Sequence, residues 1–255
     1  MGKSSKHFLS LVLLVAFGWS LTSLFHQDNL LHRGGMDALV SLGSAFLQPD
    51  LSRDILDIAL VATLRTFSYA ITSISLSLLV AFPLALLASG HVTSQPLVRT
   101  ATRRLLGAMR GIHELIWAWF FVAAIGLSPF AAILALAIPY TGSLGRIWAD
   151  QLEDIPRGPL LAAETSGGSK WQVIFFAVVP QGIGNMVSYG FYRLECALRS
   201  SAILSFVGLG GLGHEIHLSL SDLRFNEAAT FLYALIFIVV LVDRWSAYTR
   251  RGMVH

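Results

Sequence analysis

The most prominent pattern along the chain is a series of long apolar stretches that contain no Asp, Glu, Lys or Arg. A helix that crosses about 30 Å of hydrocarbon needs roughly 20 such residues. The stretches are Phe8 to Phe25, Thr66 to Gly90, Leu115 to Gly145, Trp171 to Tyr192 and Ala228 to Val242. The third is long enough for parts of two helices and is interrupted at Gly126-Leu-Ser-Pro129, where a short hairpin can reverse the chain. The pattern therefore predicts about six membrane-spanning helices.

Basic residues between these stretches predict the orientation of the chain, because Lys and Arg in short loops stay on the cytoplasmic side. They are Lys3 and Lys6, then Arg99, Arg103 and Arg104, then Arg146, Arg157 and Lys170, and finally Arg244, Arg250 and Arg251. All four groups fall on one side of a six-span arrangement. We therefore expect a multi-pass membrane protein with both termini in the cytoplasm.

The segment from His26 to Asp57 has the opposite character. It carries Asp28, Asp37, Asp50, Asp54 and Asp57 against Arg33 and Arg53, and it is interrupted by Gly34-Gly35 and Pro49. We expect an extracytoplasmic loop with a short interfacial helix, which divides the chain into an anchor region, 1–54, and a main domain, 55–255. The first span could instead be a secretory signal, since it has a basic start and an apolar core. No convincing small-residue cleavage pattern follows Phe25.

Composition supports the membrane interpretation. Apolar residues make up 55% of the 255 positions and charged residues only 13%, far from the soluble average of about 25% charged. The net charge of +3 is the difference between 18 Lys and Arg and 15 Asp and Glu, and the basic residues are spread too thinly to form a basic face for nucleic acid. The single cysteine, Cys196, excludes a disulfide within the chain.

The predicted cytoplasmic loop near 150–171 contains a segment of small residues, Leu161-Ala-Ala-Glu-Thr-Ser-Gly-Gly-Ser-Lys-Trp171. It predicts a short helix followed by a turn that glycine permits. Ala162-Ala163, then three residues, then Gly167, then Pro180 thirteen positions later resembles the cytoplasmic loop signature of ABC importer permeases. Leu161 stands where that family has Glu, Ala177 where it has Ile, and Val179 where it has Leu.

The resemblance to ABC importer permeases implies that this loop is a coupling helix seated in a groove of a cytoplasmic ATPase. By that resemblance Ala162, Ala163, Gly167 and Lys170 belong to the contact with the ATPase, and Glu164 could replace the acidic residue that is missing at 161. No Walker loop occurs in the sequence, so ATP and magnesium would be bound by the partner and no cofactor by this chain.

A second group of motifs resembles the phosphonate-type permeases in particular. The motifs are Tyr192-Arg-Leu-Glu-Cys-Ala-Leu-Arg-Ser-Ser-Ala202, Val207-Gly-Leu-Gly-Gly-Leu-Gly213, Gly111-Ile-His-Glu-Leu-Ile-Trp-Ala118 and Gly168-Ser-Lys-Trp-Gln-Val173. Methionine-type permeases share the loop and the glycine-rich segment. The resemblance implies an all-α type I importer domain of the bacterial cell inner membrane, methionine-permease-like in fold, that carries a phosphorus oxyanion such as a phosphonate. Its partners would be a second identical or related permease, an ATPase dimer, a periplasmic binding protein and membrane lipid.

Ionisable residues inside apolar spans cost about 2.5–3.5 kcal/mol on insertion scales and therefore usually face protein or water. Arg110 and Glu114 are four residues apart, with His113 beside them, which predicts one shared helical face near the start of the third span. Glu195 and Arg199 repeat this spacing, with Arg193 nearby. These residues could form internal ion pairs that orient helices, or they could line a path for an anion, because Arg matches phosphonate oxygens bidentately.

The glycines Gly208, Gly210, Gly211 and Gly213 are expected to pack backbone closely around that path. Their match to a dinucleotide-binding pattern lacks the strand that the pattern requires. Prolines 83, 139 and 180 are expected to kink their helices. The competing class is an intramembrane metal-dependent hydrolase. Against it, Trp117 occupies the position where a zinc protease needs a second histidine after His113, and His214 with His217 gives only two metal ligands.

Overall fold

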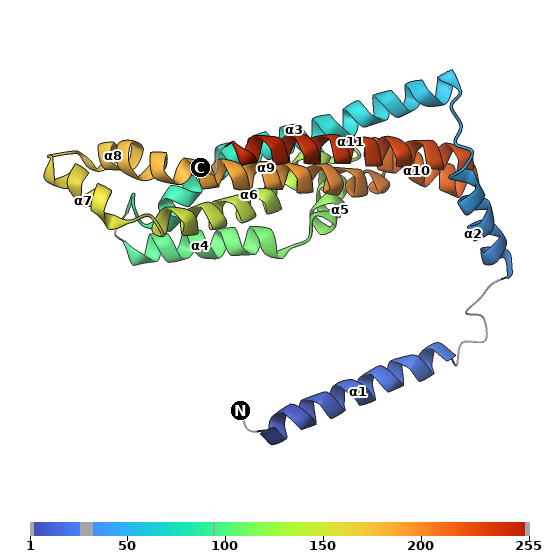
Figure 1. Ribbon diagram of the computed structural model, residues 1–255, viewed down its shortest axis with the longest axis horizontal. Helices are drawn as coiled ribbons and strands as arrows, with labels where there is room; N and C mark the ends of the chain where they lie inside the picture. The colour runs from blue at the N-terminus through green and yellow to red at the C-terminus, as the bar shows by residue number, and fades with distance from the viewer. Residues whose placement is uncertain (1–2, 26–32, 94, 253–255) are drawn as a thin grey trace. The chain divides into compact units, whose positions relative to one another are not determined.

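The computed structural model describes residues 3–25, 33–93 and 95–252, and these parts of the chain are helical (Figure 1). Asp28 lies outside the described residues, as do the side chains of Lys3, Lys6, Arg33 and Asp37. The α-helices are α1 (Lys3–Phe25), α2 (Arg33–Ala45), α3 (Arg53–Ser89), α4 (Pro96–Gly111), α5 (Glu114–Ile125), α6 (Pro129–Glu153), α7 (Arg157–Thr165), α8 (Lys170–Val173), α9 (Val179–Leu204), α10 (Leu212–Ser221) and α11 (Phe225–Arg251). A π-helical turn, η1 (Ile174–Val178), precedes α9, and a 3-10 turn, η2 (Ser205–Val207), follows it.

The chain divides into two compact units, residues 1–48 and 49–255. The first unit contains α1, whose segment from Ser10 to Thr22 is apolar, and α2, which occupies the place of the short helix expected in the outer segment. The extracytoplasmic loop was expected to extend to Asp57, but α3 already begins at Arg53 and includes Asp54 and Asp57. A domain boundary near residue 54 remains a prediction.

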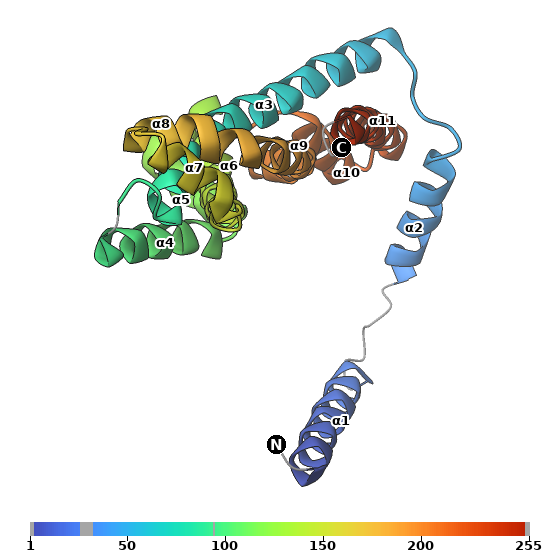
Figure 2. The same cartoon turned by 60° about the vertical axis from the view of Figure 1, so that its left-hand side comes forward.

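In the second unit, α3, α6, α9 and α11 form the central bundle, and α3 packs mainly on α6. Figure 2 looks nearly along the axes of α9 and α11, which lie next to each other. Alanines and glycines dominate the contacts of α6, and a Cβ added to Gly142 would lie 2.6 Å from the carbonyl oxygen of Leu106 in α4. Helices pack in lipid through such small residues, because close approach of backbones supplies the attraction that the hydrophobic effect cannot provide there.

Within the described residues, four helical segments are long and apolar enough to cross a membrane: Arg53–Ser89, Pro129–Glu153, Lys170–Val207 and Phe225–Arg251. Helices α4 and α5 together make a fifth candidate, although they meet at an angle of 86°. The apolar segment of α1 is shorter. A membrane-spanning role for α1, and with it the total of six, stays a prediction.

The expected basic loop before the third span is in fact helix α4. Arg103 donates from Nε to the carbonyl oxygen of Ala88 at 2.9 Å and pairs with Asp150 at 3.0 Å and with Glu153. Arg99 also pairs with Glu153, and Arg146 pairs with Asp150 at 3.2 Å. These ion pairs hold α4 against the ends of α3 and α6, so residues that mark the predicted cytoplasmic side also join three helices.

Helices α7 and α8 lie at one end of the bundle and α10 at the other (Figure 1). Residues 170–204 form a continuous helical segment with the wider turn η1 inside it, where the N–H of Val179 donates to the carbonyl oxygen of Ile174. Pro180, which has no N–H to donate, comes directly after this turn as the second residue of α9. Pro83 and Pro139 lie inside α3 and α6, and whether they kink these helices stays a prediction.

Candidate functional site

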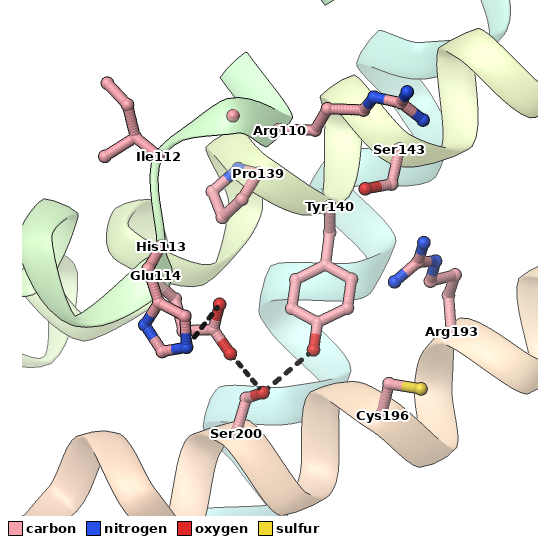
Figure 3. A pocket seen from close by; sticks show the side chains of 11 residues that line it. Arg110, Ile112, His113, Glu114, Pro139, Tyr140, Ser143, Arg193, Cys196 and Ser200 are labelled. Atoms are coloured by element: carbon pink, nitrogen blue, oxygen red, sulfur yellow. Dashed lines mark hydrogen bonds and ion pairs between the residues drawn. The ribbon is translucent and has the colours of Figure 1, made fainter. Parts of the chain in front are cut away.

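A cavity of about 570 Å³ opens between the end of α4, the start of α5, the middle of α6 and α9 (Figure 3). It is lined by Arg110, Gly111, Ile112, His113, Glu114, Pro139, Tyr140, Ser143, Arg193, Cys196 and Ser200. Three residues that the sequence marks as candidates, Arg110, Glu114 and Arg193, therefore lie in one cavity.

The break between α4 and α5 shapes this cavity. The expectation that Arg110, His113 and Glu114 share one helical face is wrong, because α4 ends at Gly111 and α5 begins at Glu114. Ile112 and His113 are extended, and His113 Nδ1 accepts from the N–H of Leu115 at 3.3 Å as an N-terminal cap. Because the two helices meet at 86°, Arg110 and Glu114 enter the cavity from different directions.

A chain of hydrogen bonds joins three helices across the cavity. Tyr140 Oη in α6 donates to Ser200 Oγ in α9 at 3.0 Å, and Ser200 Oγ donates to Glu114 Oε1 in α5 at 2.6 Å. The second carboxylate oxygen, Oε2, lies 3.9 Å from His113 Nε2. The chain fixes the orientation of the Glu114 carboxylate relative to α6 and α9.

Arg193 rests among tyrosine rings. Its Nε donates to Tyr189 Oη at 2.8 Å, and its guanidinium carbon lies 5.2–5.8 Å from the ring centres of Tyr140, Tyr189 and Tyr192. These distances are in the range of cation–π attraction. No carboxylate pairs with Arg193 or Arg110 among the residues that the structure describes. The cavity therefore presents two guanidinium groups and one carboxylate.

Glu195 and Arg199 face another side of α9, away from this cavity. Glu195 is 6% exposed, and its carboxylate lies 2.8 Å from Arg250 Nη2 in α11 and 3.9 Å from Arg199 Nη2. This is the internal ion pairing that the sequence leaves open as an alternative. A role for Glu195 and Arg199 in a substrate path stays a prediction without geometric support from this cavity.

The glycine-rich segment packs against α3 rather than lining the cavity. Gly208, Gly210 and Gly211 have φ of +94°, +75° and +106°, and a Cβ on Gly213 would collide with the carbonyl oxygen of Ala202. Gly211 borders a separate cavity of about 330 Å³ that Asp57, Arg65 and Glu215 also line. The expected close backbone packing is confirmed, whereas the place of these glycines along a path remains a prediction.

The loop from Leu161 to Trp171 folds as the sequence predicts. Helix α7 ends at Thr165, Gly167 has φ of +81°, and the N–H of Gly168 donates to the carbonyl oxygen of Ala163 at 3.1 Å. Helix α8 then starts at Lys170. No residue of α7 is buried in this chain, and Leu161 and Trp171 are each 56% exposed. Ala162, Ala163, Glu164 and Lys170 thus lie on a protruding element that could contact another protein.

Tyr140 lies outside every motif described above, and Cys196 and Ser200 lie within the motif from Tyr192 to Ala202 but were not predicted to line a cavity. A signal existed for two of them, because Arg193, Cys196 and Ser200 follow the spacing i, i+3, i+7 of one helical face. No group of three His, Cys, Asp or Glu side chains that could hold a metal ion occurs in the described part of the chain.

Comparison with known proteins gives consistent matches. Residues 81–243 match the family described as "Binding-protein-dependent transport system inner membrane component". The phosphite transport system permease protein PtxC of Stutzerimonas stutzeri is 30% identical over 85% of this chain and 78% of its own length. The phosphate-import permease protein PhnE of Mycolicibacterium smegmatis is 33% identical over 76% of this chain and 36% of its own length. An inward-facing structure of the MetNI methionine ABC transporter covers 80% of this chain and 100% of the matched chain, with 18% identity and a TM-score of 0.69.

Proposed function

The chain belongs to the family of inner-membrane components of binding-protein-dependent transport systems, and from this premise we propose that it carries a phosphorus oxyanion through the cavity at Arg110 and Arg193. Family membership makes it a permease subunit of an ABC importer, in which ATP is hydrolysed by a separate subunit. It is a transport subunit, not an intramembrane hydrolase.

The observation that carries the substrate class is the identity of the relatives. The two permeases at 30% and 33% identity are named for phosphite and phosphate, whereas the methionine transporter at 18% identity indicates the shared fold alone. The cavity supports the same class, because two guanidinium groups without acidic partners in the described chain suit an oxyanion. Methionine is the second candidate substrate.

The partners follow from the family in outline and are proposed in detail. A cytoplasmic pair of ATPase subunits would bind ATP and magnesium and hold α7 in a groove, with contacts from Ala162, Ala163, Glu164, Gly167 and Lys170. A second permease chain, identical or related, would complete the path, and a periplasmic binding protein would deliver the substrate. The basic residues near α4, α7 and the end of α11 favour a cytoplasmic location for both termini.

One continuous stretch of chain connects the loop at α7 to the cavity. Residues 157–204 run from α7 through the turn and η1 into α9, which carries Arg193, Cys196 and Ser200. Single π turns inside α-helices are rare and frequently occur at functional sites. Movement of α7 by the ATPase would therefore be transmitted along α9 to the walls of the cavity, which would alternate between access from inside and from outside.

The single cysteine allows a direct test of the cavity. Cys196 lines it and is the only cysteine in the sequence, so a thiol reagent labels one place. In importers assembled from cysteine-free partner subunits, we expect an anionic methanethiosulfonate to block phosphite uptake and phosphite to slow the labelling. The Cys196→Ser variant should lose sensitivity to the reagent. Full labelling of Cys196 with undiminished uptake would place the path elsewhere.

A further inference from the structure

The cavity contains a hydrogen-bond acceptor among its donors, the Glu114 carboxylate, whose Oε2 accepts no hydrogen bond from the described residues and has only His113 Nε2 within ion-pair distance. Glu114 Oε1 accepts from Ser200 Oγ, whereas the distance of 3.9 Å between Oε2 and His113 Nε2 is too long for a hydrogen bond. Among the hydrogen bonds of the described residues, none ends on Oε2. The Glu114 side chain is 23% exposed and lines the cavity, so Oε2 can accept a hydrogen from a bound molecule.

The hydroxyl groups near Glu114 form a donor chain that ends on its carboxylate. Tyr140 donates to Ser200 and Ser200 donates to Glu114, and an ionised carboxylate can only accept. Arg193, by contrast, uses Nε for Tyr189 and has two Nη groups left for a ligand. Arg193 from α9 and Glu114 from α5 both line the cavity, with the Tyr140 side chain drawn between them (Figure 3), so a molecule in the cavity meets donors from Arg193 and an acceptor at Glu114.

The combination of donors and one acceptor distinguishes oxyanions that carry an O–H hydrogen from oxyanions that do not. A phosphate monoester has a second pKa of about 6 and is protonated only in part near neutral pH, whereas inorganic phosphate has a third ionisable hydrogen and keeps at least one O–H there. Sulfate is fully ionised there and offers only acceptors. A sulfate oxygen facing Glu114 Oε2 would place two negatively charged acceptors together without a hydrogen between them, which is unfavourable.

We propose that the cavity selects phosphorus oxyanions that bear an acidic hydrogen, and that Glu114 is the residue that recognises this hydrogen. The inference rests on the proposed function and deepens it by assigning the specificity of the same site. Arg193 and Arg110 attract the oxyanion, Glu114 accepts its hydrogen, and Ser200 and Tyr140 are positioning residues that hold the carboxylate in place. Discrimination against sulfate then occurs inside the permease, in addition to any selection by a binding protein.

The test is equilibrium binding to the purified permease–ATPase complex without the binding protein, with [32P]phosphate and [35S]sulfate as probes. The unaltered complex should bind phosphate at least about tenfold more tightly than sulfate. Glu114→Gln should weaken phosphate binding by about tenfold, the order expected for a hydrogen bond to a charged group, and should leave sulfate binding unchanged or improved. Ser200→Ala should reduce the preference to a smaller extent, because it frees the carboxylate to rotate.

Glu215→Gln is the matched control, because Glu215 borders the other cavity and its loss removes the same charge. It should keep the preference for phosphate. If the Glu114→Gln variant does not assemble, the preference for phosphate over sulfate, measured in the unaltered complex and in the Ser200→Ala variant, tests the proposal. Equal affinity for both anions in the unaltered complex would overturn the selection by Glu114 while leaving phosphite transport intact. Absence of phosphite transport would instead overturn the proposed function.

Discussion

Replacing Arg193 by Gln lowers ATP-driven phosphite uptake by about 10- to 100-fold in an assembled importer. Charge-assisted hydrogen bonds contribute about 1.5–3 kcal/mol each, and Gln cannot replace the two Nη groups that Arg193 directs at the cavity. Arg193→Lys should be intermediate, since it keeps the charge but loses the planar fork. Uptake is measured in proteoliposomes with radiolabelled phosphite and is expressed per assembled complex.

Arg199→Gln is the matched control for this measurement. Arg199 is on the same helix and carries the same charge, but it faces Glu195 outside the cavity and its side chain is 54% exposed. Because exposed ion pairs contribute little, uptake should stay within about twofold of the unaltered protein. An equal loss in both variants would contradict the division of α9 into a cavity face and an ion-pair face. So would a loss of assembly in Arg193→Gln with normal uptake per remaining complex.

Gly167→Val is expected to abolish both substrate uptake and the ATP hydrolysis that the loaded binding protein stimulates. A Cβ on Gly167 would meet no atom within 4 Å, so the cost is conformational: φ is +81°, a region that costs an L-residue about 1–2 kcal/mol and a β-branched residue more. The turn between α7 and α8 would then rearrange. The measurements are uptake and stimulated ATPase activity of the reconstituted complex.

Two controls separate strain from bulk at the loop. Gly167→Asn should retain most of the activity, because Asn tolerates positive φ, and Gly158→Val in α7 tests added volume at an open position without positive φ. The loop must also be cytoplasmic, so alkaline phosphatase fused after Arg251 should be inactive. Normal uptake and stimulation in Gly167→Val would show that the loop is only a connector, and an active fusion would reverse the orientation.

The helices could be predicted well from the apolar runs, but the residues at which the helices begin and end could not. Helix α3 begins at Arg53, well before the uncharged stretch, because a helix can include charged residues wherever their side chains reach water or protein. The break before α5 did leave signals in the sequence: Gly111 ends α4, His113 caps α5, and Glu114 lies in the favourable first turn. The four-residue spacing of Arg110 and Glu114 predicted one continuous helix, because residues four apart share a face only where the helix is unbroken.

The candidate site could be predicted in part. Helical periodicity turns residues 195 and 199 to a different side from residues 193, 196 and 200, so the separation of Arg199 from Arg193 was available from the sequence. The contribution of Tyr140 to the site could not be predicted from the sequence. Its bond to Ser200 joins residues 60 positions apart, and it depends on how α6 packs on α9. The order of residues along each helix says nothing about which neighbour that helix meets.

ATP-driven uptake by the whole importer, reconstituted from this permease, its ATPase and its binding protein, tests the proposed substrate most directly. With labelled phosphite and labelled methionine offered separately, we expect phosphite to accumulate in an ATP-dependent manner and methionine not to accumulate. Accumulation of methionine, with phosphite remaining at the level seen without ATP, would contradict this expectation.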